Sequence, residues 1–588
     1  MSRRGHALVP LLMMLALTTS GCISLPSSGE IRTEPFREQL TDETPVDFTP
    51  GGPRPGAPAI EIVSSFLLAM RATPLNTSVA RQFLTAQSSE SWLPEQGTVV
   101  YDTQALTLAG QDVRLDLSDT VRLDTRGGWQ GGAGDLTYNI DLVREAGQWR
   151  INAPPDRLLI PTDHFETRFQ QYYLYFFDKS AEVLVPEPVY VPTGAQATTF
   201  LVDGLLAGPG RGLLGVERTY LPARTQLDDI SVPVTSDGTA EVPLSDDVLD
   251  LDPPQMTRAF AQIAWTLRQV SGIRRMRVTV DGSPLELPGR GPDVPVTDWS
   301  EYDPSLTWAS QSLFGLREGQ VITLIGGEER RVSGAFGSLD LGLRRIGVDL
   351  SGNEIAGTTD DGRVLVANRS RDPGSTPDFS DARPVLTGGT DLLAPTWDLH
   401  GIIWLLDRTP DGAELSLVRN GVAREVEVAG LTGQDVGALI VSRDGTRVVA
   451  HVAKGGRDTL VQARVQRDPD GRVRVVTPAS SLPVPDLGRR RVLDLAWRTP
   501  GTVAVLTAPS ESTSQLLMVK VDGSSTLADA TGDAEVFRGP SSQLVTSSVT
   551  GAPVLLRTPD GDIYSLAANG RWTGASIARG LRSPTFVG

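Results

Sequence analysis

The hydrophobic positions of residues 58–165 predict helices first and strands afterwards. Five apolar side chains recur at helical spacing, in a run that ends at Thr73-Pro74: Ile60, Val63, Phe66, Leu67 and Met70. A second short helix is expected at Ser78–Leu84. Alternation of apolar and polar residues then predicts strands around Val113, Leu115 and Leu117, around Leu136, Tyr138, Ile140 and Leu142, and around Trp149 and Ile151. Helices followed by an antiparallel sheet indicate an α+β domain.

Residues 168–290 show both periods again and predict a second α+β domain. Tyr172–Phe177 and Val183–Val191 are expected strands, and the helix after them carries Phe200, Leu201, Leu205 and Leu206. Pro253-Pro254 opens another helix, whose apolar face carries Met256, Phe260, Ile263, Leu267 and Val270. Alternation of Met276, Val278 and Val280 before Asp281-Gly282 predicts a strand and a turn. Residues 291–319 are expected to be a linker.

The region 320–588 is predicted to be all-β. Asp-Gly pairs separate its short apolar stretches, which is typical of hairpins, and they begin at Asp361, Asp411, Asp444, Asp470, Asp522 and Asp560. Loosely similar segments start at Ile346, Ala394, Ala438, Asp494 and Ser547, with a spacing of about 44 to 56 residues that matches one four-stranded blade. The sequence therefore predicts a β-propeller of five or six blades. A pair of β-sandwiches is the alternative for the same strands.

Residues 1–21 have the features of a secretory leader. Two arginines precede the apolar run Ala7–Leu17, which is too short to span a bilayer. The hydrophobic residues of a twin-arginine signal do not follow, so the general secretory route is favoured. Small residues then lead to Cys22 in an order that resembles a bacterial lipobox, with Thr19 in place of the usual Leu. Such a cysteine becomes the acylated N-terminus, and its palmitate and diacylglycerol chains would hold the protein on a membrane.

The composition narrows the classes of function. The chain has 71 acidic against 54 basic residues, a net charge of −17, so its overall charge does not attract nucleic acid. The single cysteine rules out an internal disulfide. No second apolar run in the sequence is long enough to span a bilayer. Residues 22–57 are polar and without period, and are expected to be the lipidated cysteine and a disordered tether.

Candidate catalytic and metal-binding residues are few. The mature chain has His164, His400 and His451, without partners at zinc-ligand spacing, and a structural or surface role is favoured for each. The sequence holds no G-x-S-x-G or S-x-x-K motif. We therefore predict no catalytic residue, no cofactor and no metal site. A triad or a carboxylate pair assembled from distant positions stays open.

Four aspartates cluster before the helix that begins at Pro253. They are Asp246, Asp247, Asp250 and Asp252, a set that suggests calcium ligands. Their spacing lacks the alternate ligand positions, the central Gly and the final Glu of an EF-hand. Negative charge near a helix N-terminus is favourable, so a solvated loop that opens the helix is the favoured interpretation.

Several segments of the middle domain resemble a known family. TYLPARTQL (Thr219–Leu227), SDGTAEVPLS (Ser236–Ser245) and AQIAWTLRQVSGIRRMRVTVDG (Ala261–Gly282) resemble the GerMN domain. With LVPEPVYVP (Leu184–Pro192) and LLAGPGRGL (Leu205–Leu213), nearly the whole chain resembles the LpqB lipoproteins of actinobacteria. The resemblance implies a GerMN domain and a propeller-like C-terminal domain. The first domain resembles the cystatin-like or NTF2-like class.

The resemblance also implies a function. LpqB lipoproteins are associated with the MtrAB two-component system and are thought to bind the extracytoplasmic domain of the MtrB sensor histidine kinase. We therefore expect a protein that is lipid-anchored at the extracytoplasmic face of the cell membrane, is not an enzyme, and modulates such a kinase, affecting the cell envelope and division. The alternative is an envelope glycan-binding or hydrolytic lipoprotein, in which sugars stack on tryptophans; the available ones are Trp308, Trp397, Trp404, Trp497 and Trp572.

Overall fold

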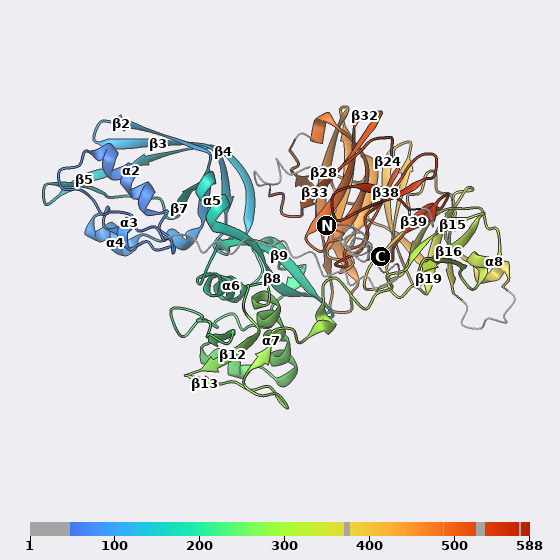
Figure 1. The fold of residues 1–588 in the computed structure, drawn as a ribbon, viewed down its shortest axis with the longest axis horizontal. Helices are drawn as coiled ribbons and strands as arrows, with labels where there is room; N and C mark the ends of the chain where they lie inside the picture. Colours follow the sequence, from blue (N-terminus) through green and yellow to red (C-terminus); the bar gives the residue numbers. More distant parts are fainter. Residues whose placement is uncertain (1–46, 370–376, 486, 525–534, 576–577) are drawn as a thin grey trace, which may run out of the picture. The chain divides into compact units, whose positions relative to one another are not determined.

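The computed structural model describes residues 47–369, 377–485, 487–524, 535–575 and 578–588. The predicted leader 1–21, the acylation site Cys22 and most of the predicted tether lie outside the described residues. Among the described residues, no helix is both long enough and apolar enough to cross a membrane. Figure 1 shows the course of the chain from the first helices to the C-terminal strands.

The first domain is α+β, as its pattern predicts. Helix α2 (Ala59–Ala69) buries Ile62, Val63, Phe66 and Leu67 on one face, which confirms the first predicted helix. The other helices are α3 (Ser78–Arg81), α4 (Ala86–Ser91), η1 (Pro94–Gln96) and α5 (Thr162–Arg168). The strands are β1 (Thr98–Tyr101), β2 (Thr103–Ala109), β3 (Asp112–Leu123), β4 (Trp129–Ile140), β5 (Leu142–Glu145), β6 (Gln148–Ile151) and β7 (Leu158–Pro161).

The sheet of this domain has the order β2-β3-β1-β7, with β4 paired to β3 and with β5 and β6 as a separate hairpin. Its apolar side packs on α2, where the tilted rings of Trp92 and Phe66 have centroids 5.4 Å apart. Order begins before the predicted end of the tether at residue 57, because the backbone of Phe48 exchanges two hydrogen bonds of 2.9 Å with Thr73. Backbone pairing of this kind leaves no hydrophobic period that the sequence could reveal.

The second domain carries two small sheets and two helices. One sheet has the order β10-β8-β9, the other β11-β12-β13 with β14 paired to β12. The strands are β8 (Phe169–Asp178), β9 (Leu184–Pro192), β10 (Glu217–Arg218), β11 (Thr239–Pro243), β12 (Arg275–Val280), β13 (Ser283–Pro284) and β14 (Val294–Pro295). The helices are α6 (Ala197–Leu206), η2 (Arg211–Leu213), η3 (Asp246–Asp250), α7 (Pro253–Leu267) and η4 (Ser300–Tyr302). The predicted strands and helices of this domain are confirmed.

The predicted linker 291–319 is largely folded. Val294 and Val296 are buried in the core of the second domain, and the Trp265 indole N–H donates to the Trp299 carbonyl oxygen at 3.0 Å. Leu306 and Ala309 are buried in the first core of the C-terminal region. The sequence pattern misses these contacts because single apolar residues between prolines and glycines form no period.

The C-terminal region consists of six successive sheets, each with at least four antiparallel strands. The first sheet holds β15 (Leu313–Arg317), β16 (Gln320–Ile325) and β17 (Glu328–Arg331). The second holds β18 (Leu343–Val348), β19 (Glu354–Thr359), β20 (Val364–Asn368) and β21 (Arg383–Leu386). The third holds β22 (Thr396–Trp397), β23 (Ile403–Thr409), β24 (Gly412–Arg419) and β25 (Val422–Glu425). Short helices α8 (Ala335–Ser338) and η5 (Phe379–Asp381) lie between strands.

The last three sheets continue this pattern. The fourth sheet holds β26 (Asp435–Val441), β27 (Arg447–Lys454), β28 (Arg457–Arg467), β29 (Val473–Val476) and β30 (Ser480–Leu482). The fifth holds β31 (Arg491–Thr499), β32 (Thr502–Ser510), β33 (Thr513–Lys520) and β34 (Glu535–Phe537). The sixth holds β35 (Gln543–Val545), β36 (Leu555–Arg557), β37 (Ile563–Leu566) and β38 (Trp572–Gly574). The final strand β39 (Arg582–Thr585) pairs with β15 and so belongs to the first sheet. Helix η6 (Leu487–Arg489) precedes β31.

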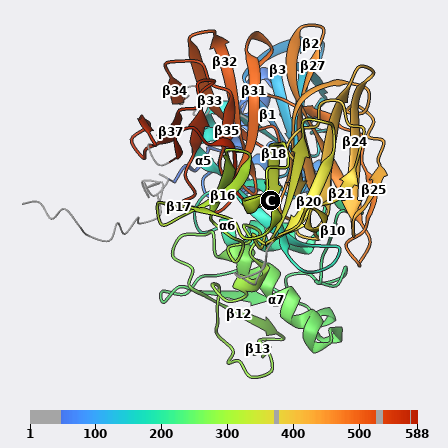
Figure 2. The same cartoon turned by 90° about the vertical axis from the view of Figure 1, so that its right-hand side faces the viewer.

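Apart from β39, which pairs with β15, and β30, which pairs with β28, the strands pair in chain order within each sheet, as in propeller blades and unlike two large packed sheets. Figure 2 shows the end of the chain beside β18, where the Gly588 N–H donates to the Val348 carbonyl oxygen at 2.9 Å. The predicted Asp-Gly turns are confirmed, since the glycine has a positive φ in each, for example 75° at Gly362 and 70° at Gly445. That backbone region favours glycine because a Cβ atom would clash there.

Candidate functional site

The strongest concentration of buried charge lies where the β8–β9 hairpin meets the C-terminal sheets. Every residue of β9 is buried, although Glu187 interrupts its apolar sequence. A carboxylate in such a place needs partners, because an unpaired buried charge is very costly. These partners come from β27 and β28, about 260 residues further along the chain.

Two arginines bind Glu187. Arg464 donates from Nη1 and Nη2 to the two carboxylate oxygens at 2.8 and 3.1 Å, a bidentate arrangement. Arg447 donates from Nη2 to Glu187 Oε1 and also, at 2.8 Å, to the Pro186 carbonyl oxygen. Its guanidinium is almost fully buried, with 1% of the side chain exposed. The hairpin and the sheet of β27 and β28 therefore share one buried ionic cluster.

A second carboxyl group completes this cluster. Glu217 of β10 is buried, and its Oε1 lies 3.9 Å from Arg464 Nη1. Burial and the neighbouring Glu187 carboxylate raise the pKa of Glu217 well above its usual value. Burial alone would also raise the pKa of Glu187, but the charges of Arg447 and Arg464 outweigh it and hold that pKa low. Glu187 is therefore the ionised member, and Glu217 the one that keeps its proton.

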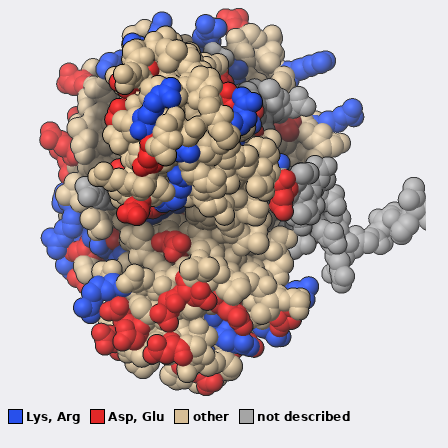
Figure 3. All heavy atoms as spheres, turned by 90° about the vertical axis from the view of Figure 1, so that its left-hand side faces the viewer, with Lys and Arg blue, Asp and Glu red and all other residues tan. Residues whose placement is uncertain are grey.

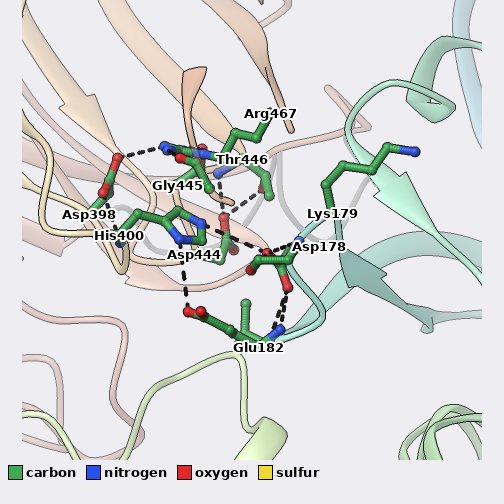
Figure 4. A network of polar contacts seen from close by, with 12 residues as sticks. Asp178, Lys179, Glu182, Asp398, His400, Asp444, Gly445, Thr446 and Arg467 are labelled. Carbon is green, nitrogen blue, oxygen red and sulfur yellow. Dashed lines mark hydrogen bonds and ion pairs between the residues drawn. The ribbon is translucent and has the colours of Figure 1, made fainter. Parts of the chain in front are cut away.

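A second polar group lies at the tip of the same hairpin (Figure 4). Arg467 donates to Asp398 Oδ2 at 2.5 Å and to the Gly471 carbonyl oxygen at 2.8 Å. His400 lies beside this pair, with Nε2 3.8 Å from Asp178 Oδ2 and Nδ1 3.8 Å from Glu182 Oε2. Burial and then the Arg467 charge lower the pKa of His400, and the nearby carboxylates do not reverse this. His400 is thus neutral at neutral pH.

Tyr190 of β9 joins all three parts of the chain. Its backbone N–H donates to the Gly127 carbonyl oxygen at 2.8 Å. Its ring lies 5.7 Å from that of Trp129 in the first domain, and its hydroxyl donates to Ser524 Oγ at 2.6 Å in the C-terminal region. A side chain would not fit at Gly127, because an added Cβ would lie 2.3 Å from the Tyr190 carbonyl oxygen.

The chemistry of this junction is structural. Two carboxyl groups with pKa values pushed in opposite directions would suit acid–base catalysis. Here, however, Glu187 is bound by two guanidiniums and Glu217 is only 1% exposed, so a substrate has no access to them. The pair of Glu187 and Glu217 is therefore a buried link between the hairpin and the C-terminal sheets.

The predicted histidines lie apart. His164 is on α5, where burial and Arg71 lower its pKa to about 4. His451 is on β27, with Nε2 3.1 Å from Asp458 Oδ1. His400 is the one that belongs to the junction, and its side chain is 5% exposed, so of the two roles that the sequence leaves open it has the structural one. Within the described ranges, no three His, Cys, Asp or Glu side chains gather as metal ligands would.

The aspartate cluster opens a helix. Asp252 caps α7, accepting from the Gln255 N–H at 2.8 Å while Gln255 Oε1 accepts from the Asp252 N–H at 3.2 Å. This capping box satisfies two free backbone N–H groups. Asp247 pairs with Arg224 at 3.2 Å. Figure 3 shows the face of the molecule that lies on the left in Figure 1. Acidic side chains gather over the lower part of this face, at the height at which Figure 1 places β12 and β13.

The tryptophans do not form an exposed platform. Trp308 is 56% exposed, whereas Trp397, Trp404 and Trp497 are buried in cores of the sheets and Trp572 is partly buried. Trp404 donates from its indole N–H to Asp398 Oδ2 at 2.7 Å. Sugar stacking needs open aromatic faces, so the placement of these tryptophans does not support the glycan-binding alternative.

Sequence reasoning missed Glu187, Glu217, Arg447, Arg464 and Arg467. One local signal existed for Glu187, the single charge within the apolar segment LVPEPVYVP. A charged residue in a fully buried strand predicts a partner of opposite charge. The sequence could not name this partner among 51 arginines, because the contact joins distant segments.

Three family models match the chain. They are described as "Lipoprotein LpqB, N-terminal domain" at residues 52–166, "Sporulation and spore germination" at residues 173–286 and "Lipoprotein LpqB beta-propeller domain" at residues 319–563. The first GerMN domain of the sporulation protein GerM from Bacillus subtilis is 24% identical, covering 22% of this chain and 99% of that one with a TM-score of 0.19.

Relatives are similar over almost the full length. Lipoprotein LpqB of Thermobifida fusca is 28% identical, covering 95% of this chain and 95% of the relative. Lipoprotein LpqB of Streptomyces avermitilis is 26% identical, covering 95% and 94%. Most of the helices and strands fall within the matched segments in the same order, whereas β14, β15, β38 and β39 lie outside them. The chain therefore belongs to the LpqB family of lipoproteins, with an LpqB N-terminal domain, a germane domain and a β-propeller domain.

Proposed function

We propose that this lipoprotein is anchored by acylated Cys22 at the extracytoplasmic face of the cell membrane and modulates a sensor histidine kinase there. The partner is the extracytoplasmic domain of a kinase of the MtrB type in an MtrAB-type two-component system, with effects on the cell envelope and division. The observation that carries the proposal is the similarity to LpqB lipoproteins along 95% of the chain. An anchor raises the local concentration of a binder near its membrane partner without new contacts.

The arrangement of the sheets supports a binding role. We propose that the six sheets close into a ring, since β39 completes the first sheet and the Gln543 amide donates to the Pro584 carbonyl oxygen at 3.1 Å between β35 and β39. A ring leaves two faces free to recognise a partner. The first domain, with α2 packed on a sheet that is antiparallel except for the parallel pair β1–β7, fits an NTF2-like fold.

We assign no catalysis to this function. The carboxyl pair Glu187 and Glu217 is closed to substrates, and the three histidines lie in separate environments. The ionic cluster instead fixes the β8–β9 hairpin against the sheet of β27 and β28. A binder gains affinity from such rigidity, because less conformational freedom is lost on binding.

A pull-down of the full acylated chain tests the partner. A small tag is inserted into the exposed turn Lys454–Arg457, which joins β27 to β28. Membranes are solubilised in a nonionic detergent, and the tagged wild type is compared with Cys22→Ala. We expect the wild type to recover a sensor kinase and the variant to recover much less. Recovery of peptidoglycan fragments alone would contradict the proposal and favour glycan binding.

Phosphorylation of the response regulator tests the modulation itself. A clean deletion strain is complemented with the wild type or with Cys22→Ala, and the phosphorylated fraction is measured on affinity gels. We expect the deletion to change this fraction and only the wild type to restore it. An unchanged phosphorylated fraction in the deletion strain would refute a regulatory role.

A further inference from the structure

A polar cavity of about 550 Å³ lies between the C-terminal sheets. Each of the six sheets contributes one strand to its wall, namely β18, β22, β26, β31, β35 and β39, and Arg408 of β23 and Arg557 of β36 also line it. The last residues of the chain, Phe586 to Gly588, lie on its wall. Its volume is within the range of about 300–1,000 Å³ that small-molecule sites occupy.

The charge of this wall is strongly one-sided. Six arginines line the cavity, and Asp494 is the one acidic residue among its lining residues. Three of the arginines have acidic neighbours: Arg344 contacts Asp360, and Arg345 and Arg408 share Asp391. The other three are Arg443, Arg557 and Arg582.

These three arginines lack carboxylate partners. Within the described part of the chain, no Asp or Glu oxygen forms an ion pair with any of them. Arg443 donates to two carbonyl oxygens, those of Ser305 and Val587, and burial lowers its pKa to about 10. Burial and then the charge of Arg582 lower the pKa of Arg557. Among the described residues, none of these three arginines is paired with an Asp or Glu carboxylate, so positive charge accumulates on this wall.

Asp494 does not neutralise these arginines. Its two carboxylate oxygens accept from the Leu495 and Leu544 N–H groups, at 2.9 and 2.8 Å. Burial raises its pKa to about 6, so the group is partly protonated just below neutral pH. Asp494 thus links β31 to β35 through these hydrogen bonds, and it forms no ion pair with the cavity arginines in the described chain.

Unused hydrogen-bond donors line the same cavity. Trp497 Nε1, Thr546 Oγ1 and Ser548 Oγ are buried, and none has a hydrogen-bond partner in the residues that the structure describes. An indole N–H can only donate, so Trp497 requires an acceptor. Buried donors without partners are rare, and a bound acceptor is one common reason for them.

We propose that this cavity binds a small ligand that carries a carboxylate or phosphate group. The oxyanion faces Arg443, Arg557 and Arg582, because guanidiniums match the planar geometry of such oxygens. The unpartnered donors Trp497, Thr546 and Ser548 serve the acceptor atoms of the same ligand. The site goes beyond the proposed kinase partnership and does not depend on it.

Calorimetric titration of the full chain in nonionic detergent tests the site. The two probes are inorganic phosphate and citrate, with glycerol as the uncharged control, at constant ionic strength because salt screens exposed charges. The variants are Arg582→Gln, whose side chain is exposed in the cavity, and Arg557→Gln. The matched control is Arg472→Gln, which removes an exposed arginine outside the cavity that lies 3.6 Å from Asp470.

We expect at least one probe to bind the wild type and the Arg472→Gln control alike. Each cavity variant should raise the Kd at least about tenfold, since a hydrogen bond to a charged group is removed. Binding of phosphate alone or of citrate alone identifies the source of the oxyanion, and both results support the site. Failure of both probes to bind, equal affinity in the cavity variants, or an equal loss in Arg472→Gln overturns the proposal.

Discussion

The buried carboxyl pair allows a sharp test of the junction, because the two members should respond in opposite ways. Glu187 accepts three charge-assisted hydrogen bonds from Arg447 and Arg464, whereas Glu217 accepts none in the described chain. We therefore expect Glu187→Gln to destabilise the protein and Glu217→Gln to stabilise it.

The sign for Glu217 follows from its raised pKa. Between the ordinary carboxyl pKa and the raised value, the folded state holds a proton that the unfolded state has released. Stability is therefore lost as pH rises through that window, by about 1.4 kcal/mol for each pH unit. Glu217→Gln removes this loss, so its stabilising effect should grow as the pH rises above the ordinary carboxyl pKa of 4.5.

The sign for Glu187 is the reverse. Its lowered pKa contributes stability above the ordinary carboxyl value, and that stability is lost as pH falls. Breaking a buried ion pair by removing one partner costs about 3–5 kcal/mol. In Glu187→Gln, the neutral Glu217 can release its proton and replace part of the lost charge. The double variant, Glu187→Gln with Glu217→Gln, has no such replacement, so its loss of unfolding free energy should exceed the sum of the changes in the two single variants.

Thermal unfolding at several pH values measures these effects. One kcal/mol corresponds to about 2–4 °C in Tm for a unit of 150–250 residues. Glu217→Gln should thus raise Tm by about 3–6 °C per pH unit across the window, and Glu187→Gln should lower it. If both single variants lowered Tm equally, with the same pH dependence, then Glu217 would be ionised and our assignment of the proton would be wrong.

Three further predictions concern other parts of the chain. Burial and the Arg467 charge lower the pKa of His400, so the stability that the neutral imidazole contributes is lost as pH falls through about 6.5. His400→Gln should therefore make the fall in Tm between pH 7 and pH 5 less steep, and an unchanged slope would contradict this. Asp252→Ala should cost about 1 kcal/mol through loss of the α7 cap, measured by urea unfolding against the neighbouring control Asp250→Ala. Gly362→Ala should lower Tm more than Gly342→Ala, because both have positive φ but only the former brings a Cβ within 2.1 Å of a carbonyl oxygen; equal effects would refute the steric argument.

Much of the secondary structure could be predicted because its causes are local. The apolar face of α2 repeats every three or four residues, and Phe66 and Leu67 on that face are buried as expected. The Asp-Gly pairs predict turns because glycine tolerates a positive φ, as at Gly445. The blade-sized spacing of similar segments predicts repeated sheets, and six sheets fall within the predicted range of five or six blades.

The sites themselves could not be predicted because they join distant segments. The sequence marks Glu187 as unusual within an apolar strand, but its ion pair with Arg447 spans 260 residues. Arg557 and Arg582 are two of many arginines until the sheets place them on one cavity wall. Similarly, the sequence leaves His400 with either a structural or a surface role, and only the structure places it beside Asp178 and Glu182.

The sequence by itself determined the leader-like N-terminus, the family, the order of helices and strands, and the acidic composition, because each depends on residue identity and short-range spacing. Only the tertiary structure decided which charges are buried, which carboxyl group keeps its proton, and where uncompensated arginines meet. The physical reason is that desolvation and charge pairing depend on distances between atoms, and these distances are set when remote strands such as β9 and β28 pack together.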